Sequence, residues 1–321
     1  MDRQLALEFV RVTEAAAISA ARFMGKGDKI GADQAAVDAM RKAFNKVRVS
    51  GKVVIGEGEM DEAPMLYIGE VVGRGGEGVD IAVDPVEGTT LVAKGMPGAL
   101  AVLAIAPTGC LLNAPDMYMD KIAVGSRARG KIDINAPVTE NLKNVAKAMD
   151  RHVNELTVII LDRDRHIPII NEIREAGARI KLINDGDVSP ALSIAVEGTS
   201  VHMLLGVGGA PEGVLAAAAL KCLGGDMQAR LIPEGPEDII RAKKMGIDDI
   251  NKVLYMDDLV KGSDIFFAAT AITSCDLLDE VRYFPGGART NSIVVRGTSA
   301  TIRFIDAIHR LENEPLHSIK L

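Results

Sequence analysis

The chain has 321 residues, of which 48% are hydrophobic and 25% charged, and it carries a formal net charge of -7. That length supplies the core of one large domain or two ordinary ones, and the acidic balance excludes a basic surface for nucleic acid or an anionic membrane. No run of about 18 apolar residues predicts a membrane span, and the start lacks the layout of a signal peptide, so we expect a cytoplasmic protein.

The first quarter of the chain carries helical patterns and one short strand. Apolar residues from Leu5 onward fall on one helical face, and Gly25 is a suitable C-terminal residue for that helix. A second helix carries Asp33 in its first turn and an apolar stripe that reaches Val47. We then expect a strand over residues 52–55, an acidic stretch over 56–62 and a third helix over about 64–72.

The middle of the chain is rich in strand patterns. Residues 79–83 alternate, which predicts a strand that buries its branched side chains and presents Asp80 and Asp84 on the opposite face. An apolar run at 99–106 and strand-like stretches through Ile122 follow. A helix over 138–149 then leads to a predicted boundary between an N-terminal α+β domain, residues 1–152, and a C-terminal α/β domain, residues 153–321.

Beyond residue 152 the pattern becomes regular. Strands over 157–161, 179–183 and 201–205 alternate with helices over 167–176, 190–196 and 212–222. This alternation favours parallel βαβ units, in which ligands bind at the carboxyl ends of the strands. The loops expected there are polar or rich in glycine and cover residues 162–165, 184–187 and 206–213.

The segment Asp84-Pro85-Val86-Glu87-Gly88-Thr89-Thr90 is the most informative motif. Its two carboxylates can bind divalent cations, and Gly88 and Thr89 would begin a helix whose free N–H groups face a phosphate. A pair of cations about 4 Å apart can activate water for phosphoryl transfer, and Thr89 would lie beside the phosphate. An ordinary Asx-type turn at Asp84 is the alternative interpretation.

A second acidic stretch, Gly56-Glu57-Gly58-Glu59-Met60-Asp61, spaces its acids at every second position. Solvated loop acids are the alternative here, but the two glycines indicate a bent or closely approached backbone. Cys110, Cys222 and Cys275 lack a CxxC spacing, and the five histidines lack HExxH spacing. We therefore expect an oxygen-ligated metal, magnesium or manganese, rather than zinc.

Two glycine motifs resemble nucleotide-binding sequences but have the wrong context. Residues 73–78 fit GxGxxG, yet they precede a strand instead of following one. Residues 125–131 fit GxxxxGK, but Ile132 stands where a P-loop needs Ser or Thr. The first is predicted to be a turn, and the second does not support a site for a nucleotide triphosphate.

The C-terminal part offers weaker candidates. Arg163 and Arg165 can fork onto a phosphate, and Asp185 and Asp187 can accept hydrogen bonds from sugar hydroxyls. A surface arginine and an Asx turn are the alternatives. Glu212 follows a glycine-rich loop at a predicted helix start, where it can also serve only the helix dipole.

Taken together, the motifs resemble the bacterial class II fructose-1,6-bisphosphatases over nearly the whole chain. The residues that carry the resemblance are Lys29, Asp33, Gly56-Glu57-Gly58-Glu59, Asp84-Pro85-Val86-Glu87-Gly88-Thr89, Asp185-Gly186-Asp187 and Gly209-Ala210-Pro211-Glu212-Gly213. The wider lithium-sensitive phosphatases of sugars and inositol usually have Asp where this chain has Glu87, which favours the class II branch.

The resemblance implies a fold, a reaction and a set of site residues. The fold would be a layered α/β/α/β/α sandwich, assembled as a homodimer or homotetramer. The reaction would be metal-dependent hydrolysis of the 1-phosphate of fructose 1,6-bisphosphate in gluconeogenesis, with Mn²⁺ or Mg²⁺. Asp33 and Glu57 would hold one cation, and Asp84, Glu87 and Glu212 another.

The resemblance also implies that Thr89 helps to activate the attacking water, that Asp61 supports the metal centre and that Lys29 neutralises developing charge. The implied substrate-binding positions are Glu87, Gly88, Thr89, Tyr118, Arg163, Asp164, Arg165, Asp185, Gly186, Asp187 and Gly209. The alternatives are a phosphatase acting on sedoheptulose bisphosphate, inositol monophosphate or a nucleotide bisphosphate, and a non-catalytic sugar-phosphate sensor.

Overall fold

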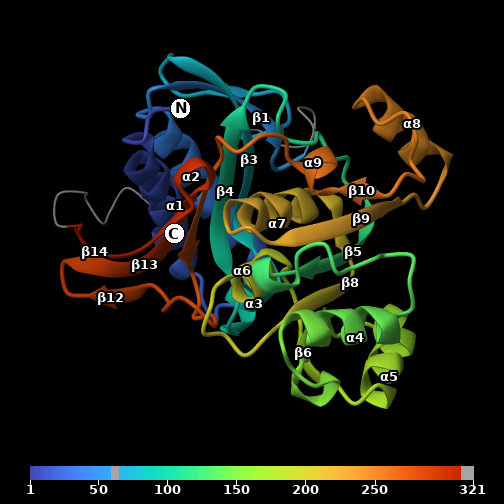
Figure 1. The fold of residues 1–321 in the computed structure, drawn as a ribbon. Helices are drawn as coiled ribbons and strands as arrows, with labels where there is room; N and C mark the ends of the chain where they lie inside the picture. The colour runs from blue at the N-terminus through green and yellow to red at the C-terminus, as the bar shows by residue number, and fades with distance from the viewer. Residues whose placement is uncertain (59–64, 312–321) are drawn as a thin grey trace.

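The computed structural model describes residues 1–58 and 65–311, and the chain folds around two mixed β-sheets (Figure 1). The helices are α1 Leu5–Ala21, α2 Lys29–Phe44, α3 Thr89–Lys94, α4 Val138–Ala148, α5 Ile167–Glu175, α6 Val188–Ala195, α7 Ala210–Cys222, α8 Pro236–Lys244 and α9 Met256–Leu259. The strands are β1 Val49–Ile55, β2 Val71–Val72, β3 Glu77–Glu87, β4 Leu100–Pro107, β5 Tyr118–Val124, β6 Thr157–Leu161, β7 Arg179–Ile183, β8 Met203–Gly209, β9 Asp226–Ile232, β10 Leu254–Tyr255, β11 Phe266–Ala271, β12 Arg282–Phe284, β13 Gly287–Arg296 and β14 Thr301–Arg310.

The first sheet has the strand order β12-β13-β11-β4-β3-β1-β2, with β14 paired along β13. Its β1 and β3 are parallel, whereas β3 and β4 are antiparallel. The second sheet has the order β10-β9-β5-β8-β6-β7. There β6 is parallel to both β7 and β8, as the alternating pattern predicts, but β5 runs antiparallel between β8 and β9.

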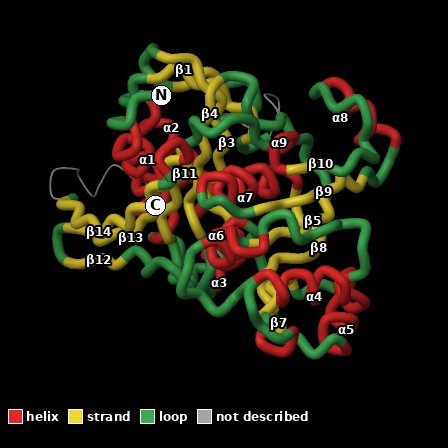
Figure 2. Tube along the Cα trace, viewed as in Figure 1, coloured by secondary structure: helices red, strands yellow, loops and turns green. Residues whose placement is uncertain are grey.

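Helices cover and separate these sheets, which confirms the predicted α/β class and its α/β/α/β/α layers. One hydrophobic cluster joins α1 and α2 to the first sheet, and another joins α4 and α5 to the second. Between the sheets, α6 and α7 share a cluster with strands of both. Figure 2 shows α7 in red between the yellow strands of the two sheets. Every side chain of α7 from Val214 to Leu220 is fully buried, which suits a helix packed on both sides.

The predicted helix over 64–72 is wrong where the structure describes it. Residues 65–70 form bends and turns, and β2 then pairs with β1. Leu66 and Gly69 adopt φ values of 56° and 98°, which no α-helix contains. The buried Glu70 carboxylate accepts the Leu66 N–H, a side-chain contact that stabilises this turn.

Several smaller expectations are confirmed. The strand predicted at 52–55 is the end of β1, and the helix begun by Gly88 and Thr89 is α3. Residues 73–76 form bends before β3, and residues 125–131 hold only a short 3-10 helix. The prediction that Asp33 lies in the first turn of its helix is wrong by one residue, since Asp28 caps α2 by accepting the Gly31 N–H and Asp33 is the fifth residue of that helix.

The division into two domains at residue 152 stays a prediction, and sheet membership does not follow it. Strand β5 lies before residue 152 but belongs to the second sheet, and β11–β14 lie after it but belong to the first. Among the described helices, none is both long and apolar enough to cross a bilayer.

Candidate metal and phosphate site

The end of β3 brings the two acids of the central motif to the layer between the sheets. β3 and β4 keep a regular register up to Asp84 and resume it at Glu87, so the strand is irregular between these two residues. Such an irregularity re-aims side chains next to it. Gly88 follows with φ 88°, in the left-handed region that favours glycine, and α3 begins at Thr89.

Asp84 also accepts the Val86 N–H at 3.0 Å, so the Asx-type turn exists together with the converging acids. Asp80, on the same strand, has a different role. Its carboxylate is buried and accepts the backbone N–H groups of Gly109, Cys110 and Leu111. Asp80 therefore stabilises a turn and does not belong to the acidic cavity.

Glu57 reaches the same region from β1. Because β1 and β3 are parallel neighbours, their carboxyl ends meet at one edge. A Cβ added at Gly56 would lie 2.0 Å from the Leu66 carbonyl oxygen, so the close backbone approach predicted for this glycine is confirmed. Asp33, from α2, lines the same cavity as Glu57, and the two carboxyl groups influence each other's pKa.

A cavity of about 340 Å³ collects four of the predicted acids and the predicted hydroxyl. Its walls include Asp33, Glu57, Asp84, Thr89, Asp116 and Glu212. These side chains come from α2, from the loops after β1 and before β5, from β3 and α3, and from the first turn of α7. Only the tertiary structure brings them together.

The acids are held where ionisation without a cation is costly. Burial and the neighbouring Asp33 raise the pKa of Glu57 to about 8. Burial is also the main cause that raises the pKa of Asp33, Asp84 and Glu212, and the charges of the surrounding acids raise that of Asp84 further. Such a group of carboxylates favours either bound protons or bound cations.

Glu87 ends β3 and does not itself line this cavity. Its Oε1 accepts the N–H groups of Asp187 and Val188, at 2.5 and 2.6 Å, at the start of α6. Burial and the charges of Asp187 and Glu212 outweigh those hydrogen bonds and raise the pKa of Glu87 to about 8. A Cβ at Gly186, where φ is 82°, would lie 3.3 Å from Glu87 Oε1, so glycine suits this close approach.

Two orphaned oxygens test whether a cation would fit. Glu87 Oε2 and Glu212 Oε2 are buried and have no hydrogen-bond partner among the described residues. An all-oxygen donor set of this kind fits a hard divalent cation. In residues 1–58 and 65–311, however, no three acidic, histidine or cysteine side chains already surround a single metal position. The carboxylates thus form a cavity wall and would have to close around an ion.

Lys121 is the functional candidate that our sequence reasoning missed. It lies on β5, is 2% exposed, forms an ion pair with Asp187 and donates to the Gly209 carbonyl oxygen at 2.8 Å. Its charge opposes the upward shift of the Glu212 pKa. The available signal was its position inside the strand-like stretch that follows Tyr118. A lysine that is buried on a strand needs a partner for its charge. Asp116 was missed as well.

The predicted substrate-binding residues divide into two groups. Tyr118 pairs with Gly209 across β5 and β8, and the Arg165 guanidinium lies 4.8 Å from the centre of the Tyr118 ring. Asp187 and Gly209 both contact the Lys121 ammonium, and Gly186 lies against Glu87, but none of these residues lines the acidic cavity. Arg165 also donates to the Val207 carbonyl oxygen at 2.8 Å.

The other predicted positions do not line the acidic cavity either. Arg163 donates to two backbone carbonyl oxygens, Asp164 begins a short 3-10 helix, and Asp185 lines a separate cavity of about 350 Å³ beside α3. Lys29 is exposed at the start of α2. Asp61 lies outside the described residues, so its predicted role stays a prediction.

Comparisons with known proteins agree with the metal and phosphate site that the geometry indicates. The model of a family described as "Bacterial fructose-1,6-bisphosphatase, glpX-encoded" matches residues 3–309. A Synechococcus sp. (strain JA-3-3Ab) protein is 49% identical and covers 100% of both chains, and a Trichodesmium erythraeum (strain IMS101) protein is 50% identical over 96% of this chain and 97% of its own. Both are named "D-fructose 1,6-bisphosphatase class 2/sedoheptulose 1,7-bisphosphatase".

Proposed function

The chain belongs to the family of bacterial, glpX-encoded fructose-1,6-bisphosphatases, and from this membership we propose that it hydrolyses the 1-phosphate of fructose 1,6-bisphosphate to fructose 6-phosphate and phosphate. The observation that carries the proposal is the cavity where Asp33, Glu57, Asp84 and Glu212 converge around Thr89. A phosphate monoester is strongly anionic, so a buried acidic cavity would repel it unless cations intervene. The acids and the substrate class therefore agree only for a metal-dependent enzyme.

We propose that Asp33 and Glu57 hold one divalent cation and that Asp84, Glu87 and Glu212 hold another, with Mn²⁺ as the first choice and Mg²⁺ as the alternative. A bound divalent cation supplies Lewis acidity for the phosphoryl oxygens and lowers the pKa of water. The two orphaned oxygens of Glu87 and Glu212 support this assignment. Two amide donors at the start of α6 fix the other Glu87 oxygen, so its carboxylate is already oriented.

Thr89 is proposed to orient the attacking water. It is the first residue of α3, its side chain lines the acidic cavity, and Gly88 in the left-handed conformation sets the turn that places it there. A hydroxyl can donate one hydrogen bond and accept two, so Thr89 can bridge a carboxylate and a water. Asp61 and Lys29 keep their proposed supporting roles, as a helper of the metal centre and as a neutralising charge.

The sugar is proposed to lie toward β5 and β8. Tyr118, Arg165, Asp187 and Gly209 gather there around Lys121. Arg165 stacked on Tyr118 is held in a fixed orientation, which suits recognition of the second phosphate. Arg163, Asp164 and Asp185 keep their proposed substrate-binding roles, which rest on the resemblance of their motifs to the family.

Sedoheptulose 1,7-bisphosphate is a second proposed substrate. The relatives from Synechococcus and Trichodesmium carry that activity in their names and match this chain at 49% and 50% identity. The two sugars share the phosphate that would be cleaved and differ by one carbon in the body. A site that recognises chiefly the phosphates would accept both.

Phosphate release from purified protein tests the proposal. Fructose 1,6-bisphosphate, sedoheptulose 1,7-bisphosphate and inositol 1-phosphate would each be assayed with manganese, with magnesium and with chelator. We expect metal-dependent release from the fructose substrate and little from inositol 1-phosphate. No release from any substrate, in folded and metal-loaded protein, would favour the sugar-phosphate sensor instead.

We also propose a cytoplasmic homo-oligomer. The three cysteines are free, which suits a reducing compartment. On β14, Ile302, Phe304 and Ile308 are exposed, and the described strands pair with β14 along one edge only. Exposed apolar side chains on an edge strand favour pairing with a second copy of the chain.

A further inference from the structure

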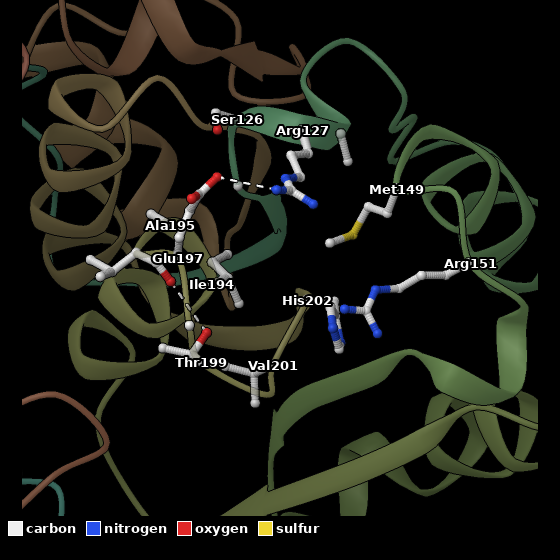
Figure 3. Close-up of a pocket in the computed structure, with 14 residues that line it drawn as sticks. Ser126, Arg127, Met149, Arg151, Ile194, Ala195, Glu197, Thr199, Val201 and His202 are labelled. Carbon is white, nitrogen blue, oxygen red and sulfur yellow. Dashed lines mark hydrogen bonds and ion pairs between the residues drawn. The ribbon is translucent and has the colours of Figure 1, made fainter.

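A second cavity, of about 420 Å³, lies away from the acidic one and has the opposite chemical character (Figure 3). Its walls come from the loop after β5, the end of α4, the end of α6 and the start of β8. The charged and polar groups at its walls are Arg127, Arg151, His202, Glu197, Ser126 and Thr199. The volume is in the range of cavities that take small-molecule ligands.

The two cavities lie at opposite ends of the same elements. Tyr118 and Gly209 pair at one end of β5 and β8, and Val124 and Met203 pair at the other, next to the second cavity. Strands of seven residues span roughly 20 Å. In α6, the first turn donates to Glu87, whereas the last residues line the second cavity. The second cavity is therefore not an extension of the acidic one.

Close backbone packing and side-chain hydrogen bonds shape this cavity. A Cβ at Gly125 would lie 2.3 Å from the Ile194 carbonyl oxygen, so glycine lets the loop after β5 pack directly on the end of α6. Thr199 donates to the carbonyl oxygens of Ser193 and Val196, which ties down the turn after that helix. These contacts join the loop after β5, the end of α6 and the turn that follows it.

His202 presents a single donor to the cavity. The residue is 6% exposed, and its Nδ1 accepts the Thr157 N–H at 2.9 Å. In the neutral ring the proton must then be on Nε2, which has no partner among the described residues. Burial and the charges of Arg151 and Arg179 lower the pKa of His202, so the ring remains a neutral donor.

Two arginines complete the recognition of an anion. Figure 3 shows the guanidinium groups of Arg127 and Arg151 turned toward the space beside the His202 ring. The Arg151 guanidinium makes no hydrogen bond or ion pair with the described part of the chain, whereas the backbone N–H of this residue donates to the Ala146 carbonyl oxygen. Arg127 has only Glu197 at 3.5 Å, and both of these side chains are more than 60% exposed, so the pair is weak and can be displaced.

From these observations we propose that the second cavity binds a small phosphate monoester with a compact apolar body, at a site separate from the acidic one. Forked guanidinium donors and an imidazole N–H suit the oxygens of a phosphate. Met149, Ile194 and Val201 supply the apolar walls for the rest of the ligand. A ligand there would contact the ends of β5, β8 and α6, whose other ends carry residues of the proposed active site.

The test uses the metal-loaded, full-length protein with ¹³C-labelled histidine, and the probes are inorganic phosphate and phenylphosphonate, which cannot be hydrolysed. His202 reports on the second cavity, and its signal is assigned by its loss in His202→Gln. His166 reports on the opposite end of β8, because its Nε2 accepts the Val207 N–H at 2.8 Å. Sodium chloride at equal ionic strength is the blank.

We expect the His202 signal to move saturably with both probes, and at lower concentration with phenylphosphonate. Arg151→Gln should raise the half-saturating concentration about tenfold or more, since it removes a charged hydrogen-bond donor. Arg129→Gln is the matched control, because it makes the same charge change on a neighbouring exposed residue that does not line the cavity. Equal melting temperatures would show that both variants are folded.

Three outcomes would overturn the proposal. The first is a His202 signal that stays still while that of His166 moves, which would place the anion toward the other end of β8 and not in the second cavity. The second is an equal response in Arg151→Gln and Arg129→Gln, which would indicate a general ionic effect. The third is a half-saturating concentration of phenylphosphonate that is not lower than that of phosphate. That result would show that the cavity does not recognise an apolar body.

Discussion

Replacement of Lys121 by methionine should destabilise the protein because it leaves a buried charge without its counter-ion. Lys121 is 2% exposed and Asp187 is 5% exposed, so solvent cannot take over the ion pair between them. The variant also removes the donor to the Gly209 carbonyl oxygen at 2.8 Å. Methionine has nearly the same length as lysine, so the change is chiefly electrostatic and leaves no large void.

The size of the effect follows from the burial of the pair. Breaking a buried ion pair by removal of one partner costs about 3–5 kcal/mol. For 321 residues at about 2.1 cal/mol/K each, the entropy of unfolding is about 0.67 kcal/mol/K. The midpoint of thermal unfolding should therefore fall by about 4–7 °C.

Circular dichroism measured during heating, in the presence of metal, gives that midpoint. The matched control is the double variant Lys121→Met with Asp187→Leu, which removes both charges and should recover most of the lost stability. A single variant that melts within about 1 °C of the wild type would refute the reasoning. So would a double variant that is as unstable as the single one.

Four further predictions concern the acidic cavity and the edge of the first sheet. Glu57→Gln should abolish metal-dependent phosphate release while the protein stays folded, because it removes the charge of a proposed metal ligand; near-normal turnover would contradict the assignment. Thr89→Ala should lower kcat by about 10²-fold or more with little change in KM, since its hydroxyl acts on the reacting water; an effect confined to KM would count against that role. In chelator, the free energy of unfolding should fall as pH rises from about 5 through about 8. Glu57 and Glu87, with pKa values of about 8, hold their protons more tightly in the folded state than in the unfolded state. Added Mn²⁺ should remove that fall, and a flat profile in chelator would argue against the raised pKa values. Phe304→Asp should convert the proposed oligomer to monomer in light scattering, with Arg303→Asp as the exposed neighbour that should leave it assembled.

The central motif shows how far local pattern reaches. Alternation over 79–83 predicted the strand, and Gly88 with Thr89 predicted the helix that follows, because both depend on residues close in sequence. The same pattern could not distinguish Asp80 from Asp84. Asp80 accepts three amide N–H groups from a turn some thirty residues away, and that turn is placed by tertiary packing.

The wrong helix at 64–72 has a similar cause. The residue types in 64–72 are compatible with a helix. However, the Glu70 carboxylate accepts hydrogen bonds from the Leu66 N–H and from the Arg41 guanidinium of α2. The edge of β1 also offers β2 a partner. Long-range contacts therefore outweighed the local preference.

The sequence by itself determined the fold class, most of the elements and the residue types of a site for metal and phosphate, because period, turn chemistry and charge are local properties of a chain. The tertiary structure decided which of those residues meet. It placed Asp33, Glu57, Asp84 and Glu212 on one cavity together with Asp116, and it left Arg163 and Asp185 outside that cavity. It also paired the buried Lys121 with Asp187. Those outcomes depend on strand order and on packing between sheets, which arise from contacts between residues far apart in sequence.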